Sequence, residues 1–182
     1  QVFQYSLDGG TTWTDYTGTA FAVNPGDSTV NVRIDTIDDS IDEADETFTL
    51  TGTLNSNGTD YTDLGTATIT DNDTPTVTVP DSTAVEGANE TFDIAITGAA
   101  AGSTLTLTTA DGTAVDADYL ATTGQVFQYS LDGGTTWTDY TGTAFAVNPG
   151  DSTINVRIDT IDDSVDEADE TFTLTGTLNS NG

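Results

Sequence analysis

Carboxylates are the most chemically capable groups in this sequence, and they occur in two crowded runs. The run at 38–46 holds six acids, and the run at 162–170 repeats all six. They are Asp38, Asp39, Asp42, Glu43, Asp45 and Glu46 in the first run, and Asp162, Asp163, Asp166, Glu167, Asp169 and Glu170 in the second. Two carboxylates about 4 Å apart repel by roughly 4 kcal/mol at the effective dielectric of a partly shielded site. Several held together therefore need a cation.

Calcium is the ion that this donor set favours. The chain has no Cys and no His, which removes thiolate nucleophiles, imidazole bases and the usual ligands of zinc, copper and non-haem iron. Calcium accepts six to eight oxygens at flexible geometry, whereas magnesium keeps more of its waters. A purely solvated acidic loop is the alternative. A second acidic tripeptide, Asp71-Asn72-Asp73, favours metal binding.

Other classes of function fit poorly. The chain carries 31 Asp and Glu against 2 Lys and Arg, a net charge of −29, so it lacks the positive surface that nucleic acid requires. No apolar run is long enough to span a bilayer, so we expect no direct membrane insertion. Catalysis would have to use carboxylates alone, as glycosidases do with one pair. These acids are too many and are duplicated, so we expect no enzyme.

Strands must position these acids, because apolar residues alternate with period two along much of the chain. That period places them on one face of a half-buried strand, and an all-β fold is expected. The alternating residues are Val30, Val32 and Ile34; Phe48 and Leu50; Val77 and Val79; Phe92, Ile94 and Ile96; and Leu105 and Leu107.

A long repeat organises the chain. Residues 1–58 return at 125–182 with two changes, Val30 to Ile154 and Ile41 to Val165, so the period is 125 minus 1, or 124 residues. Both changes keep a branched apolar side chain, and we expect both positions to face a core. A unit of this length can bury its own core as a sandwich of seven or more strands.

The joint between domains is expected at 70–77, TDNDTPTV, where an acidic tripeptide is followed by Pro75 and a new alternation. On this interpretation 1–73 is the C-terminal part of one domain. Residues 74–182 form the next domain without its last strand. Because the chain opens inside a repeat, we expect targeting signals to lie elsewhere in a longer protein.

The ordered motifs resemble the Calx-β domain, a family found in sodium/calcium exchangers and in giant bacterial surface adhesins. The resemblance rests on TADGTAVDADY at 109–119, on the string from FAVNPG to DETFTLT at 145–175, on GTATITDND at 65–73 and on AVEG at 84–87. It implies tandem immunoglobulin-like β-sandwich domains joined end to end, with calcium bound at one tip of each.

By motif, the resemblance assigns calcium ligands in both copies. These are Asp38, Asp39, Glu43, Glu46, Asp71 and Asp73 for the first copy, and Glu86, Asp111, Asp162, Asp163, Glu167 and Glu170 for the second. Asn72 stands where exchangers have a third acid.

An extra β-hairpin per repeat departs from the family pattern. Asp8-Gly9-Gly10 predicts a hairpin turn, with Phe3, Tyr5 and Leu7 in alternation on one arm and Trp13 and Tyr16 on the other. Packing of this hairpin onto the sandwich is one interpretation. The alternative is a sugar-stacking platform built from Trp13, Tyr16 and their copies Trp137 and Tyr140.

Together these features predict a calcium-stiffened structural extender of an extracellular adhesin or surface fibre, acting in cell adhesion and biofilm. Its partners would be calcium ions and neighbouring repeats of the same chain. Two alternatives remain: a self-assembling surface or matrix filament, in which other copies are the partners, and a glycan- or ice-binding module.

Overall fold

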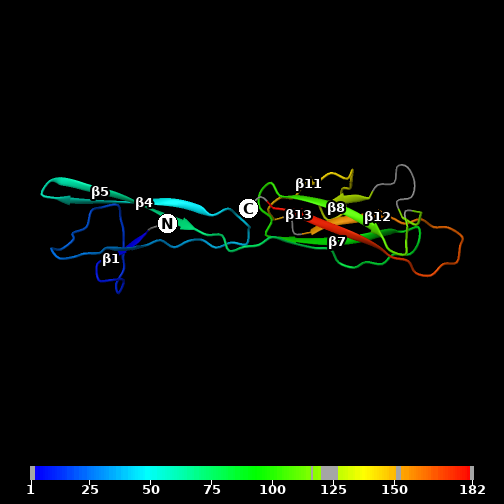
Figure 1. The fold of residues 1–182 in the computed structure, drawn as a ribbon, viewed down its shortest axis with the longest axis horizontal. Helices are drawn as coiled ribbons and strands as arrows, with labels where there is room; N and C mark the ends of the chain where they lie inside the picture. Colours follow the sequence, from blue (N-terminus) through cyan, green and yellow to red (C-terminus); the bar gives the residue numbers. More distant parts are fainter. Residues whose placement is uncertain (1–2, 116, 120–126, 151–152, 181–182) are drawn as a thin grey trace. The chain divides into compact units, whose positions relative to one another are not determined.

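The computed structural model describes residues 3–115, 117–119, 127–150 and 153–180, and all the regular structure in them is β-strand (Figure 1). The chain divides into two compact units, Gln1–Asp39 and Ser40–Gly182. The prediction of an all-β fold is confirmed.

The first unit is a three-stranded antiparallel sheet in the order β2-β1-β3. Its strands are β1 (Gln4–Ser6), β2 (Thr14–Asp15) and β3 (Asn31–Arg33). The predicted hairpin joins β1 to β2. Its turn is held by the Ser6 hydroxyl, which accepts the Gly10 amide, and by the Asp8 carboxylate, which accepts the amides of Thr11 and Thr12.

The second unit contains two facing sheets and a separate hairpin. The five-stranded sheet has the order β10-β9-β12-β7-β6, the three-stranded sheet has the order β11-β8-β13, and β4 pairs with β5; all pairs are antiparallel. The strands are β4 (Glu46–Ser56), β5 (Thr59–Ile69), β6 (Thr76–Thr78), β7 (Asn89–Thr97), β8 (Thr104–Asp111), β9 (Gln128–Ser130), β10 (Thr138–Asp139), β11 (Phe145–Ala146), β12 (Thr153–Asp159) and β13 (Phe172–Asn179).

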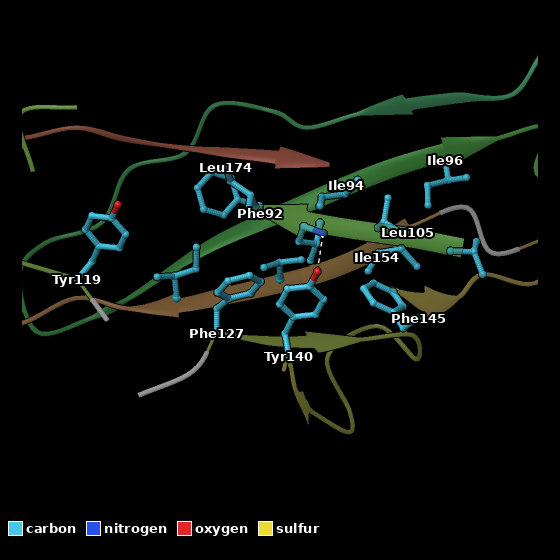
Figure 2. Packing of buried hydrophobic residues seen from close by; sticks show 14 of the residues in the cluster. Phe92, Ile94, Ile96, Leu105, Tyr119, Phe127, Tyr140, Phe145, Ile154 and Leu174 are labelled. Carbon is cyan, nitrogen blue, oxygen red and sulfur yellow. Dashed lines mark hydrogen bonds between the residues drawn. The ribbon is translucent and has the colours of Figure 1, made fainter. Parts of the chain in front are cut away.

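One apolar core lies between the two facing sheets and makes them a β-sandwich (Figure 2). Along β7, every second residue is buried, as the alternation predicted. Phe92 of β7 meets the edge of Phe172 of β13, with ring centroids 6.3 Å apart. The buried members include Phe92, Ile94, Ile96, Leu105, Leu107, Tyr119, Phe127, Tyr140, Phe145, Val147, Ile154, Val156, Ile158 and Leu174.

The extra hairpin of the second copy, β9–β10, widens the five-stranded sheet and contributes to the core. Tyr140 is buried, stacks on Phe127 with ring centroids 4.6 Å apart, and accepts the amide hydrogen of Leu107 at 3.0 Å (Figure 2). Its ring therefore has no free face for a sugar. Trp137 is half-buried, with the Arg157 guanidinium 4.3 Å from its ring centroid.

The two copies differ in burial although their sequences are nearly identical. Val156 and Ile154 on β12 are 0% exposed, whereas their counterparts Val32 and Val30 are 36% and 37% exposed. In the second copy β12 pairs with β7 and the sheet of β8 and β13 covers it. The expectation of a core position is therefore confirmed at Ile154 and wrong at Val30.

The same expectation is wrong at Val165, which is 59% exposed. Val165 lies in the acidic loop between β12 and β13, not on a strand. A branched apolar side chain in such a loop faces solvent because no second layer covers it.

Candidate metal centre

Three loops meet at one end of the sandwich, and they bring acidic side chains together. They are residues 85–88, the described residues 112–115 and 117–119 after β8, and residues 160–171, the last drawn in orange in Figure 1. Backbone hydrogen bonds join them: the Thr160 amide donates to the Ala88 carbonyl at 3.1 Å, and the Ile161 amide donates to the Asp118 carbonyl at 2.8 Å.

Tyr119 fixes the position of the neighbouring Asp118. The Tyr119 ring is buried and stacks on Phe172, with ring centroids 4.2 Å apart, and Tyr119 forms a β-bridge with Thr160. Its hydroxyl donates to the Asp111 carboxylate at 2.7 Å. Because the core holds the ring, Asp118 stays at the rim beside the acidic loop.

The C-terminal end of the acidic loop is fastened at Thr171. The Ala114 amide donates to the Thr171 carbonyl at 3.0 Å, and the Thr171 amide donates to the Thr113 hydroxyl at 2.8 Å. Gly112 allows this close approach, since a Cβ there would lie 2.3 Å from the Thr171 carbonyl oxygen. Glu170, the residue before Thr171, is held against the same rim.

Asp118, Glu167 and Glu170 each offer a carboxylate oxygen, and these oxygens all lie within 4.8 Å of one another. The pKa of Glu170 is raised from its ordinary 4.5, first by desolvation, then by the negative charge of Asp118 and a hydrogen bond with it, and also by Glu167 and Glu86. Crowded carboxylates raise one another's pKa because their negative charges repel, and binding a proton or a cation relieves this repulsion.

The Calx-beta domain family matches three successive stretches of the chain, residues 6–75, 70–132 and 129–181. The chain belongs to the Calx-beta family. Calx-beta domains are calcium-binding β-sandwich modules with structural and binding roles, and the tandem β-sandwich fold agrees with this membership. No curated protein and no solved structure matches the chain.

The acidic group at this tip of the Calx-beta sandwich fits calcium. Two oxygens on opposite sides of a calcium ion lie about 4.8 Å apart, given a bond length of about 2.4 Å, so three oxygens within 4.8 Å fit one coordination shell. Glu90, at the start of β7, is buried, and its Oε1 has no hydrogen-bond partner among the described residues. A buried carboxylate oxygen without a partner costs free energy, and Glu90 is not one of the three close acids.

The other acids predicted for the second copy surround this group in different ways. Glu86 is exposed and close enough to raise the Glu170 pKa. Asp162 packs against Gly87: a Cβ added at Gly87 would lie 2.8 Å from the Cβ of Asp162. Asp163 accepts the Val165 amide at 2.7 Å. Asp111 accepts the Tyr119 hydroxyl, and its predicted metal-binding role stays a prediction.

The acids predicted for the first copy lie in exposed or half-buried loop and strand-end positions. Asp38 and Asp39 are exposed in the first unit, and Glu43 and Glu46 are exposed in the second. The Asp71 amide donates to the Asp45 carboxylate at 3.1 Å, and the Asp73 amide donates to the Asp71 carboxylate at 3.2 Å. Within the described ranges, the group of three at the second-copy tip is the one close enough to share an ion.

Asp118 is the member of the acidic group that sequence reasoning missed, and Glu90 is a buried acid that it did not single out. Asp118 lies in the string AVDADY, next to the aromatic residue that anchors the loop. An acid directly before a buried tyrosine is held rigidly, and this neighbouring tyrosine was the sequence feature that could have identified Asp118. Glu90 stands on the core face of an alternating strand, two residues before Phe92, where a charged side chain is rare without a partner.

Proposed function

We propose that this chain is a calcium-stiffened extender segment of an extracellular adhesin or surface fibre, with a role in cell adhesion and biofilm. The observation that carries the proposal is the group Asp118, Glu167 and Glu170 at the tip of a domain that recurs in tandem. The domains are 1–73 and 74–182, and the calcium ligands of each are the acids named above together with Asp118.

Calcium would act here by binding carboxylates of neighbouring loops that otherwise repel one another. Without the ion, the acidic loop 160–171 carries charges that repel those of the neighbouring loops, and Glu170 is driven towards its protonated form. With the ion, three loops share ligands and lose the freedom to move apart. In an array of such domains, each tip becomes stiff and the chain holds its ends apart. The proposal gives these carboxylates a structural role and no catalytic one.

Localisation outside the cell belongs to the same proposal. Among the described residues there is no helix with the length and apolarity needed to cross a membrane. Extracellular calcium modules bind the ion with dissociation constants of about 10⁻⁴–10⁻³ M, so a site of modest affinity is sufficient for this role. The chain's partners would be calcium ions and neighbouring repeats.

Small-angle scattering and calorimetry on the 182-residue chain test the extender function. We expect calcium to raise the melting temperature and to make the chain's maximum dimension more uniform. Asp118→Asn should reduce the calcium-dependent rise in melting temperature, whereas Asp166→Asn, the same charge change in the second copy outside the close group, should preserve it. If the dimensions and melting temperature of the unaltered chain ignore both calcium and chelator, the extender function is wrong.

The alternative of a self-assembling filament is favoured by one observation on the β4–β5 hairpin. These two strands pair only with each other among the described residues, and Leu54, Tyr61 and Leu64 on them are exposed. Open strand edges with exposed apolar side chains pair readily with another chain. Electron microscopy of the purified chain, with Leu54→Lys as the comparison, would show filaments that the variant loses.

A further inference from the structure

Asp42 makes contacts across the joint that the calcium ligands do not account for. Its backbone amide donates to the Gly98 carbonyl at 3.0 Å, and its carboxylate oxygen Oδ2 accepts the Ser180 hydroxyl at 2.7 Å. Asp42 belongs to the acidic run of the first copy, whereas Gly98 and Ser180 belong to the sandwich that follows the joint. All three residues lie in the compact unit Ser40–Gly182, so one residue of the first acidic run is bonded twice to segments that follow the predicted joint.

The surface that Asp42 contacts consists of the 98–103 turn and Ser180, and it rests on the core of the sandwich. Ser180 directly follows β13, and its hydroxyl oxygen lies 3.4 Å from the hydroxyl oxygen of Ser103. Ser103 is fully buried, and its carbonyl accepts the Val147 amide at 2.9 Å. The turn at 98–103 also buries Ala99 and Ala100. The 98–103 turn thus presents the carbonyl acceptor, and Ser180 after β13 presents the hydroxyl, that Asp42 uses.

Gly98 shows that this contact is close-packed. Its φ is +69°, in the left-handed region, and a Cβ there would lie 3.2 Å from the Pro75 Cα and 3.3 Å from the carbonyl oxygens of Ser40 and Thr74. The acidic loop, the joint segment and the turn after β7 therefore meet at a position that only glycine fits without displacement.

We propose that Asp42 is a latch between neighbouring domains that does not require calcium. The surface formed by the 98–103 turn and Ser180 is its receptor, and the partner that this surface fits is the acidic loop of the preceding repeat. A hydroxyl that donates to a carboxylate is a charge-assisted hydrogen bond, stronger than a neutral one. Asp42 is adjacent to Glu43, a proposed calcium ligand, so one loop carries both the latch and part of the metal site.

The repeat extends the latch along an array. Because the period is 124 residues, Asp166 corresponds to Asp42, and it is placed to hold the corresponding turn of a following repeat. Within the second copy, Asp166 is not one of the three close acids. The position therefore serves the joint, whereas Glu167 and Glu170 serve the tip. The purpose of the latch rests on the proposed extender function, but its contacts do not.

Distance distributions between two spin labels test the latch. The chain has no Cys, so labels at Leu54→Cys on β4 and Thr175→Cys on β13 are unambiguous, and both positions are exposed. In chelator, we expect Asp42→Ala and Ser180→Ala each to broaden the distribution at least twofold, and the double variant to add little more. Asp166→Ala, the matched change in the second copy, should leave the width unchanged.

Two outcomes would overturn the latch: a distribution in chelator that is equally narrow with and without Asp42, or one that broadens as much for Asp166→Ala as for Asp42→Ala. Unfolding of the sandwich, monitored by Trp137 fluorescence in a Trp13→Phe background, identifies any variant that has lost its fold. The conservative variant Ser180→Thr, which keeps the hydroxyl, should keep the narrow distribution. A calcium arm separates the two proposals. If calcium has no effect while Asp42→Ala still broadens the distribution, the extender's calcium dependence fails and the latch stands.

Discussion

Replacing Tyr140 with Phe tests how the extra hairpin is built into the sandwich. The change removes one oxygen and keeps the ring that stacks on Phe127. The lost oxygen is the acceptor of the Leu107 amide, 3.0 Å away, and both residues are buried. The variant therefore isolates one hydrogen bond within an otherwise unchanged core.

The expected cost follows from what the Leu107 amide loses. A buried donor left without an acceptor costs about 1–3 kcal/mol, and the cavity left by one hydroxyl is small. We expect the free energy of unfolding of the sandwich to fall by about 1–2 kcal/mol, which lowers the melting temperature of a domain of this size by several degrees.

Urea unfolding in chelator, followed by fluorescence, measures this loss. Trp13→Phe is made first, so that Trp137 alone reports on the sandwich. The control is Tyr16→Phe in the same background, because Tyr16 makes the same stack in the first copy, on Phe3 with ring centroids 4.6 Å apart. We expect the control to leave the transition of the sandwich unchanged. A loss for Tyr140→Phe no larger than that of the control would refute the reasoning.

Three further predictions concern pH and backbone packing. In chelator, calorimetry should show that the sandwich gains stability as the pH falls from neutral towards 4.5, the ordinary pKa of Glu170. The pKa of Glu170 is raised in the folded state, so the folded state binds this proton more readily than the unfolded state does. Glu170→Gln should flatten this pH dependence. Asp132 has its pKa lowered from 3.8 to about 2 by the Thr136 hydroxyl and amide and by Ser130, so the stability that it contributes is present above 3.8 and is lost as the pH falls towards 2; acid titration of Asp132→Asn should lack this loss. Gly112→Ala should lower the free energy of unfolding, measured in urea, by about 1–3 kcal/mol and weaken calcium binding, because the new Cβ would meet the Thr171 carbonyl. The control is Gly52→Ala, whose Cβ would have no atom within 4 Å. Equal losses of stability in both variants would contradict the packing argument.

The sequence patterns predicted where strands form better than they predicted which elements cover each strand. The alternation through Phe92, Ile94 and Ile96 matches the burial along β7, and the Asp8-Gly9-Gly10 turn joins β1 to β2 as expected. Period two identifies a face but not what covers it. This is why Val32 and Val156, in the same local sequence, differ in exposure from 36% to 0%.

The candidate site was predicted in part for a related reason. Glu167 and Glu170 are neighbours in one loop, so their proximity follows from sequence alone. Asp111 and Asp118 lie seven positions apart in the same string, and the sequence does not show which of the two Tyr119 holds. In the structure Asp111 accepts the Tyr119 hydroxyl, and Asp118 joins the acidic group. The Asp42 contacts needed residues 56 and 138 positions away.

Calcium titration by calorimetry on the 182-residue chain tests the central claim most directly, with three charge-neutralising variants beside it. We predict that the unaltered chain binds calcium, that Asp118→Asn and Glu167→Gln weaken the binding at the second-copy tip at least tenfold, and that Asp166→Asn leaves it unchanged. Absence of calcium binding in the unaltered chain, or equal weakening by all three variants, would show that these carboxylates form a solvated acidic surface and not a metal site.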